Sequence, residues 1–327
     1  MSNLTFRSLS PDDLAQVSAI DSQVVGQPRR GFFEKRLAVA MAAPDAFITC
    51  AACEGDRLKG YAFARVQDGD FGSTQRVAVL DVLGVHPESR QQGVGKALLA
   101  GIEQRMVKKS ICTLRTEIDW SDHDMTRFFS ATNFTLAPIQ IVDRDTSLLP
   151  QYVEEMSQVK MDGLWQVHGP GGNDFDTLAR DRVKIRSLQE ADLADVVRLD
   201  RKLSGQDRSA YYRGKFQEML VETGIRVSLV AEKKDLLAGF IMARVDYGEF
   251  GKPIQTATVD TIGVHPAEKG TGVGHALLSQ LLINLSILQV EVLSTQILWQ
   301  QNDLHSFLKK SGFVPSQRLV LSKTISF

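Results

Sequence analysis

Residues 79–99 read VLDVLGVHPESRQQGVGKALL, and they join a strand, a loop and a helix. Val77–Val85 is an apolar run bounded by turn residues, which is typical of a strand. Gly93–Lys108 carries apolar residues at the spacing of an amphipathic helix. Glycines let the loop between them approach a ligand, and the unpaired amides at a helix N-terminus attract phosphate oxygens. The stretch therefore predicts a phosphate-binding strand–loop–helix unit.

A second copy of this stretch, TVDTIGVHPAEKGTGVGHALL, occupies residues 258–278. When the chain is shifted by 179 positions, the two copies align without a gap over about a hundred residues. A period of this length indicates a duplicated domain, because solenoid repeats span only about 20 to 50 residues. We therefore predict two domains, residues 1–149 and 183–327. Residues 150–182 between them include the breaker-rich sequence GPGGND and are predicted to be a linker.

Each copy predicts the same order of strands and helices, so the fold class is α/β, with one mixed domain made twice. In the first copy, strands are expected at residues 6–8, 47–53, 59–66, 77–85, 111–118 and 134–142. Helices are expected at residues 11–22, 30–42, 93–108 and 122–131. The last strand, 134–142, is expected to close the sheet of its own copy.

The composition is that of a globular protein, since 43% of the 327 residues are apolar and 24% are charged. A formal net charge of -1 offers no broad basic surface for nucleic acid. No apolar run approaches the roughly 20 residues that span a bilayer, and the N-terminus lacks the pattern of a signal peptide. Three cysteines fit a reducing compartment. We expect a cytoplasmic monomer or homodimer with no nucleic-acid or membrane partner.

The strand, loop and helix together resemble the signature of the GCN5-related N-acetyltransferase (GNAT) family. That family follows an L-x-V-x-P strand with an [R/Q]-x-x-G-x-[G/A] loop, which Arg90–Gly95 matches. Lys269–Gly274 matches apart from the lysine in place of arginine. The segments FFSATNF at 128–134 and FLKKSGF at 307–313 are similar to the family's F-Y-x-x-x-G-F ending. The loops have neither the Walker A spacing nor the G-x-G-x-x-G order of a dinucleotide-binding loop.

The resemblance implies two tandem domains, each a mixed, mostly antiparallel, splayed sheet flanked by helices, with acetyl-CoA (coenzyme A) as cofactor. It places the pantetheine arm on Leu83, Gly84 and Val85 in one copy and on Ile262, Gly263 and Val264 in the other. It places the pyrophosphate on Arg90, Gln91, Gln92, Gly93, Val94, Gly95 and Lys96, and on Lys269, Gly270, Thr271, Gly272, Val273, Gly274 and His275. No metal site is expected.

The implied activity is transfer of an acetyl group to a primary amine, on a small molecule or a protein, by direct attack of the neutral amine. The tyrosine that serves the family as general acid is replaced by Phe129 and Leu308. The alternative is therefore a catalytically impaired CoA-binding sensor or interaction module. The first copy is favoured as the active one because it combines Arg90 with Asp81.

Asp81 and its counterpart Asp260 occupy the strand position at which several family members carry a general-base glutamate. Period-two alternation places Asp81 on the face of residues 79, 83 and 85, from which its carboxylate could reach the cleft. The alternative is an aspartate bound to the backbone or to an arginine. Arg65 and Arg244, at equivalent points of the preceding strand, are expected to pair with these aspartates rather than to hold an acidic acceptor.

The remaining candidates each have a structural alternative. Arg29 and Arg208 lie between the first two helices of each copy, where the resemblance places the acceptor, although a loop arginine is usually solvated. Packing or loop structure is the favoured interpretation for Tyr211, Tyr212, His86, His265, Cys50 and Cys53.

Overall fold

The structure is a computed structural model that describes residues 4–26, 28–70, 73–146, 183–217, 226–234, 236–247 and 255–326. The predicted linker, 150–182, lies outside these residues. The described chain forms two compact units. Unit 1 holds the residues up to Gln140, the segment Tyr247–Ile254 and the residues from Ser316 onward, and unit 2 holds Ile141–Asp246 and Gln255–Pro315.

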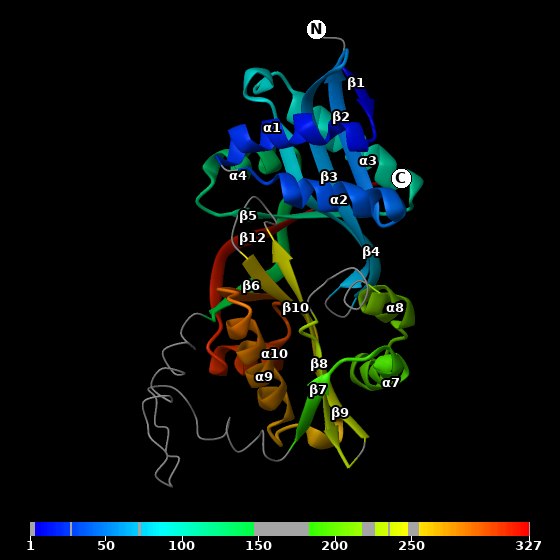
Figure 1. Cartoon of the computed structure of the whole chain (residues 1–327), viewed down its shortest axis with the longest axis vertical. Helices are drawn as coiled ribbons and strands as arrows, with labels where there is room; N and C mark the ends of the chain where they lie inside the picture. The colour runs from blue at the N-terminus through cyan, green and yellow to red at the C-terminus, as the bar shows by residue number, and fades with distance from the viewer. Residues whose placement is uncertain are drawn as a thin grey trace. The chain divides into compact units, whose positions relative to one another are not determined.

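Among the described residues, the first copy contributes nine α-helices and β-strands to unit 1, at or close to the predicted positions. All nine are labelled in Figure 1. In chain order they are β1 (Thr5–Arg7), α1 (Leu14–Val25), α2 (Arg30–Ala42), β2 (Phe47–Glu54), β3 (Arg57–Asp70), β4 (Ser73–Val85), α3 (Val94–Lys108), β5 (Thr113–Asp119) and α4 (His123–Ala131). The sheet has the order β1-β2-β3-β4-β5-β12, where β12 is Val314–Thr324. It is antiparallel except at the parallel β4–β5 pair, so the predicted mixed, mostly antiparallel sheet is confirmed.

Two separate cores sandwich this sheet. On one face, Leu98 and Ile102 of α3 pack against Ala62 and Leu80. On the other face, helices α1 and α2 pack against the aromatic residues of β3. Figure 1 shows these two helices lying across the strands of unit 1. The two faces of β4 therefore meet different helices.

Unit 2 repeats the arrangement. Its helices and strands are β6 (Thr135–Asp145), β7 (Lys184–Ser187), α7 (Leu193–Ser204), α8 (Ser209–Gln217), β8 (Leu229–Lys233), β9 (Leu236–Tyr247), β10 (Gln255–Val264), α9 (Val273–Ile287), β11 (Val292–Leu298) and α10 (Asn302–Lys310). The strand order is β6-β11-β10-β9-β8-β7. Helix α9 covers one face, and α7 and α8 cover the other.

The last strands of the two copies are exchanged. Strand β12, from the end of the second copy, pairs antiparallel with β5 of the first copy. The second half of β6 belongs to unit 2, where β6 neighbours β11. The strand predicted at 134–142 is confirmed, but the prediction that it closes the sheet of its own copy is wrong.

Two ion pairs accompany the pairing of β12 with β5. Arg318 and Lys323 of β12 form ion pairs of 2.8 and 2.6 Å with Glu117 and Glu103 of unit 1. The second copy has Gln296 and Leu282 at the positions equivalent to these glutamates. The two sheet edges otherwise have similar apolar patterns, so these charges favour pairing with the first copy.

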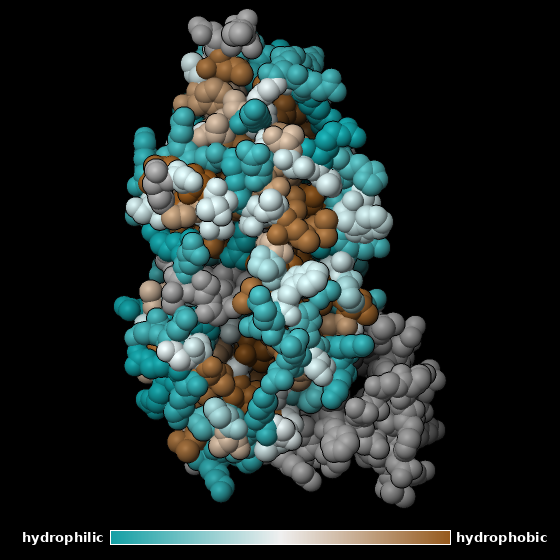
Figure 2. All heavy atoms as spheres, turned by 180° about the vertical axis from the view of Figure 1, so that it is seen from behind, coloured by the Kyte–Doolittle hydropathy of each residue, from teal (hydrophilic) through white to brown (hydrophobic). Residues whose placement is uncertain are grey.

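Among the described residues, no helix is long and apolar enough to cross a membrane. Figure 2 shows one face of the surface, on which hydrophilic side chains dominate and apolar residues occur in separate groups.

We expect Leu321→Ala, in β12, to destabilise unit 1 by about 2 to 5 kcal/mol, because Leu321 is buried in the α3 core and its truncation leaves a cavity. Hydrogen exchange followed by mass spectrometry should speed up in α3 and leave α9 nearly unchanged. The reciprocal variant Val142→Ala, in β6, should act on α9, whose core contains Val142. Faster exchange of α9 in Leu321→Ala would contradict the exchange of strands.

Candidate functional site

The parallel ladder between β4 and β5 stops halfway along β4. It runs from Val77 opposite Thr113 to Leu80 opposite Thr116. At its end, Thr116 Oγ1 donates a hydrogen bond of 3.1 Å to the carbonyl oxygen of Leu80. Beyond this point the two strands diverge, and residues 81–85 of β4 have no β5 partner in the register of the described residues. These five residues present an open strand edge, which is a template for an extended ligand with amide groups.

Unit 2 has the same open edge. Pairing of β10 with β11 ends at Val259 opposite Thr295, and Thr295 Oγ1 donates to the carbonyl of Val259 at 2.9 Å. Residues 260–264 of β10 follow, without a β11 partner in that register. The two threonines occupy equivalent positions in the repeat, and the motifs of the sequence do not include them. Their identity in both copies was the available signal.

A β-bulge on β4 changes the face of Asp81. The register with β3 pairs Leu80 with Ala64 but Val82 with Phe63, so Asp81 is the extra residue. Leu83 consequently packs on the α3 core together with Leu80, whereas Val82 packs on the α1–α2 core. The prediction that Asp81 shares a face with residues 83 and 85 is wrong, because simple alternation assumes a strand without a bulge.

Asp81 is buried on the α1–α2 face and held by two cations. Its carboxylate accepts hydrogen bonds from Arg65 at 2.8 and 3.3 Å, and Arg36 of α2 lies 3.5 Å from it. Asp260 in unit 2 pairs with Arg244 and lies 3.4 Å from Lys215 of α8. The predicted pairing of both arginines is confirmed.

The two carboxylates differ in one respect. Both oxygens of Asp81 accept hydrogen bonds, but the Oδ2 atom of Asp260 is buried and accepts none from the described residues. A buried carboxylate oxygen without a donor carries an energetic cost, which a hydrogen bond from water or from a ligand removes. Asp260 is therefore the better placed of the two to receive a hydrogen bond from a bound molecule.

The loop before α3 turns sharply through two left-handed residues, Gln91 with φ of 59° and Gly93 with φ of 82°. The equivalent residues before α9 are both glycines, Gly270 with φ of 82° and Gly272 with φ of 91°. A Cβ atom built on Gly93 meets no atom within 4 Å, so space lies open before the N-terminus of α3. The first amides of α3 have no intrahelical acceptor, and together with the helix dipole they form an anion-binding end.

Other predicted loop residues have structural roles. Gly95 lies against the ring of Phe128, because a Cβ atom there would approach that ring to 3.2 Å. His86 accepts a hydrogen bond from the amide of Glu88 at 3.3 Å and caps the turn after β4, and His265 does the same for Ala267. The loop interpretation of both histidines is confirmed.

The loop cations of the two copies differ in their ion pairs. Lys269 forms an exposed ion pair of 2.7 Å with Asp303 in the first turn of α10, and this pair lowers the pKa of the Asp303 carboxyl. Arg90 forms no ion pair with a described residue. Exposed pairs contribute little free energy, so either cation can turn toward an anion.

The remaining candidates belong to the cores. Phe129 and Leu308, which replace the expected tyrosine, are both buried, as are Tyr211 and Tyr212. Cys50 and Cys53 point into the two opposite cores of unit 1, which confirms packing. The described residues contain no group of His, Cys, Asp and Glu side chains that could hold a metal ion. Arg29 and Arg208 are not solvated but buried in ion pairs.

The profile of the Acetyltransferase (GNAT) family matches residues 18–134 and 193–313. The duplicated splayed sheet and the two matches define a tandem acetyltransferase fold, and the chain belongs to the GNAT family. N-acetylation that depends on acetyl-CoA is the general activity of that family. A search among curated proteins gave no match.

Several solved structures share the fold. A tandem GNAT protein from the clavulanic acid biosynthesis pathway is 18% identical over 99% of both chains, with a TM-score of 0.63. A GCN5-related N-acetyltransferase from Sphaerobacter thermophilus is 13% identical over 99% of this chain and 96% of its own, with a TM-score of 0.59. A glucosamine N-acetyltransferase region in a fungal multi-domain protein is 11% identical, with a TM-score of 0.65. The match to it covers 98% of this chain and 38% of that protein.

We expect Gln91→Gly to stabilise unit 1 by about 1 kcal/mol, because glycine adopts the left-handed conformation without the steric cost that other residues bear. The matched variant Gly270→Gln introduces that cost into unit 2 and should destabilise it by a similar amount. Denaturant unfolding measures both changes. A loss of stability in Gln91→Gly would contradict the left-handed assignment.

Proposed function

We propose that this protein is an N-acyltransferase that transfers an acetyl group from acetyl-CoA to a primary amine of a small molecule or a protein. The observation that carries the proposal is the open strand edge that leads directly into an anion-binding helix N-terminus, found in both units. A pantetheine arm offers amides to such an edge, and a pyrophosphate matches such a helix end. When bound, acetyl-CoA supplies the thioester whose acetyl group passes to the amine.

The residues of the site fit this ligand. Residues 83–85 of β4 and 262–264 of β10 lie on the open edges, where their backbone groups can pair with the pantetheine amides. The amides of residues 91–96 and 270–275 surround the two helix N-termini and are suited to the pyrophosphate. Arg90 supplies a cation in the loop before α3, and Lys269 supplies one in the loop before α9.

We propose that Asp260 orients or deprotonates the acceptor amine in unit 2. It is the first residue beyond the β10–β11 ladder, and its buried Oδ2 oxygen has no donor among the described residues. Asp81 stands at the equivalent point of unit 1, where Arg65 already donates to both of its carboxylate oxygens. This geometry favours unit 2 for the catalytic step, whereas the sequence favours the first copy.

A second candidate function is a CoA-binding sensor or interaction module. It is favoured by the buried side chains of Phe129 and Leu308, which offer no proton to a thiolate. Thiol release from acetyl-CoA, measured with a fixed panel of spermidine, glucosamine, L-lysine and phenethylamine, separates the two. Amine-dependent thiol release supports the transferase, and acetyl-CoA binding without release across such panels supports the sensor.

We expect Gly93→Glu to abolish acetyl-CoA binding in unit 1 and Gly272→Glu to abolish it in unit 2. Each substitution places a side chain and a negative charge before the amides of a helix N-terminus, at a left-handed position. Calorimetry should show the loss of one site in each variant. Gly93→Asn is the matched control, because asparagine tolerates the left-handed conformation and carries no charge. Loss of both sites in either single variant would contradict independent sites.

We expect Asp260→Asn to lower turnover by about 100-fold while acetyl-CoA affinity stays nearly unchanged, because the amide cannot accept the proton. Part of the rate should return at high pH, where the amine deprotonates unaided. Asp81→Asn should destabilise unit 1 by about 3 to 5 kcal/mol because it breaks a buried ion pair, and Asp260→Asn should also destabilise unit 2 because it breaks the pair with Arg244. Turnover is therefore compared at a temperature at which circular dichroism shows both variants to be folded. Unchanged turnover in Asp260→Asn with Asp81→Asn in the background would remove both aspartates from the mechanism.

A further inference from the structure

A buried ion pair joins the first two helices of unit 1. Asp21 lies in α1 and is 1% exposed. Arg29, at the N-cap of α2, donates to its two carboxylate oxygens at 2.9 and 2.5 Å. A buried ion pair rarely gives a net gain over apolar residues of the same volume, so stability alone does not account for it.

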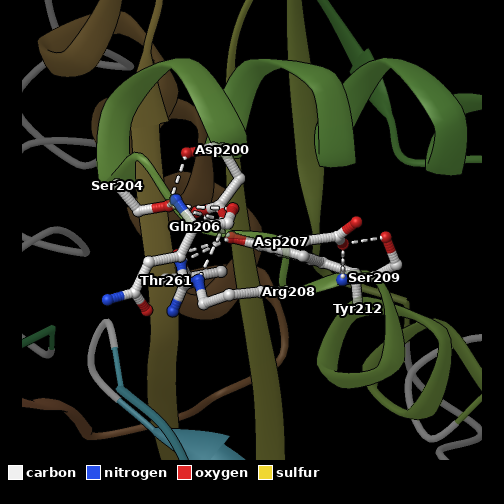
Figure 3. Close-up of polar contacts among 8 residues, drawn as sticks. All are labelled: Asp200, Ser204, Gln206, Asp207, Arg208, Ser209, Tyr212 and Thr261. Carbon is white, nitrogen blue, oxygen red and sulfur yellow. Dashed lines mark hydrogen bonds and ion pairs between the residues drawn. The ribbon is translucent and has the colours of Figure 1, made fainter.

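Unit 2 contains the same pair, shown in Figure 3. Asp200 of α7 accepts from Arg208, which precedes α8, at 2.8 Å from Nε and by a second contact from Nη2. Both residues are equivalent to those of unit 1 in the repeat. The chain therefore keeps a costly buried pair at the same helix corner twice.

Each aspartate also accepts a hydrogen bond from a tyrosine, but the two tyrosines come from different places. Tyr61 of β3 donates to Asp21 Oδ1 at 3.2 Å, and Tyr212 of α8 donates to Asp200 Oδ1 at 2.8 Å. The position equivalent to Tyr61 is Phe240, and the position equivalent to Tyr212 is Phe33. The hydroxyl has moved from a ring on the sheet to a ring on the helix, yet it reaches the same carboxylate oxygen.

The two aromatic pairs have the same geometry, which makes this exchange possible. The rings of Phe33 and Tyr61 are 5.6 Å apart at 87°, and those of Tyr212 and Phe240 are 5.9 Å apart at 83°. Burial raises the pKa of both tyrosines above the usual value, so each hydroxyl stays protonated as a donor.

The cluster rests on the open segment of the strand. The ring of Tyr61 covers Gly84, since a Cβ atom there would lie 2.5 Å from the ring, and Phe240 covers Gly263 with a corresponding distance of 2.7 Å. In unit 2 the Tyr212 hydroxyl also lies 3.5 Å from Thr261 Oγ1 on β10, as Figure 3 shows. The aspartate, arginine and tyrosine thus connect the helix corner to the strand segment beside the candidate site.

We propose that the clusters Asp21–Arg29–Tyr61 and Asp200–Arg208–Tyr212 are positioning elements that hold each helix pair over the open strand segment. The requirement is one hydroxyl donor on the Oδ1 oxygen, and either ring of the aromatic pair can supply it. The helix pair covers the face on which Asp81 lies. The cluster therefore fixes the position of the helices that border a bound acceptor. Its catalytic consequence rests on the proposed function, whereas its effect on the helices does not.

The test exchanges the hydroxyl within unit 1. Tyr61→Phe should accelerate hydrogen exchange in α1 and α2 by about 10- to 100-fold, the size expected for a lost bond to a charged group. The double variant Phe33→Tyr with Tyr61→Phe reproduces the arrangement of unit 2 and should return exchange to within about threefold of the starting protein. Helices α7 and α8 serve as the internal control. Exchange as fast in the double variant as in the single one, or no change in the single one, would overturn the proposal.

The same exchange of the hydroxyl is made in unit 2 with the single variant Tyr212→Phe and the double variant Tyr212→Phe with Phe240→Tyr. Hydrogen exchange is then measured in α7 and α8, where the single variant should accelerate it and the double variant should restore it. Thr261→Val introduces the residue of the other copy, Val82, and should leave exchange in these helices unchanged, because the hydroxyl on Asp200 is retained. If Thr261→Val accelerated hydrogen exchange in α7 and α8 as much as Tyr212→Phe does, the contact between Tyr212 and Thr261 would hold the helices. That result would overturn the proposed role of the Asp200 carboxylate.

Kinetics separate positioning from simple stability. With the panel amine that is acetylated fastest, Tyr61→Phe together with Tyr212→Phe should raise the KM for the amine about 10-fold and leave the KM for acetyl-CoA within about twofold. Restoring a hydroxyl through Phe33→Tyr and Phe240→Tyr should restore the amine KM. Equal changes in both KM values would indicate a merely structural role and overturn positioning. Absence of any turnover by the unmodified protein counts against the proposed function, and hydrogen exchange still decides the inference.

Discussion

The early end of the parallel ladder between β4 and β5 is the constraint on which the site depends. The hydroxyl of Thr116 donates a hydrogen bond to the carbonyl oxygen of Leu80, and the β-bulge at Asp81 follows in β4. The backbone beyond it has no strand partner on one side, which a folded protein tolerates only with water or a ligand. The turn that contains Gly93 and helix α3 follow directly, so the open strand edge leads along the chain into the N-terminus of a helix.

The duplication shows which features the fold requires, because the same requirement is met by different residues. The left-handed turn is made by Gln91 in one copy and Gly270 in the other. The hydroxyl on the buried aspartate comes from the sheet in unit 1 and from the helix in unit 2. In each case the geometry is retained while the side chain changes, which indicates that the position of the group matters more than its origin.

The exchanged strands make the two copies depend on each other. Strand β12 completes the sheet of unit 1, and its Leu321 packs in that core. A change near the C-terminus therefore acts on a unit built mainly from the first half of the chain. The two copies nevertheless differ at equivalent positions, since Oδ2 of Asp260 has no donor among the described residues whereas both oxygens of Asp81 accept hydrogen bonds.

The sequence by itself determined the duplication, the order of helices and strands, the loop before α3 and the family. Two kinds of signal in the sequence account for this: local ones, namely apolar periodicity and glycines, and the exact spacing of 179 residues between the two copies. Only the tertiary structure decided the face of Asp81, the partner of β12 and the burial of Arg29 with Asp21. A bulge leaves no mark in an alternating pattern, and pairing between distant charges such as Lys323 and Glu103 has no local signal. These features depend on contacts between residues that are far apart in the sequence, and only the folded chain brings such residues together.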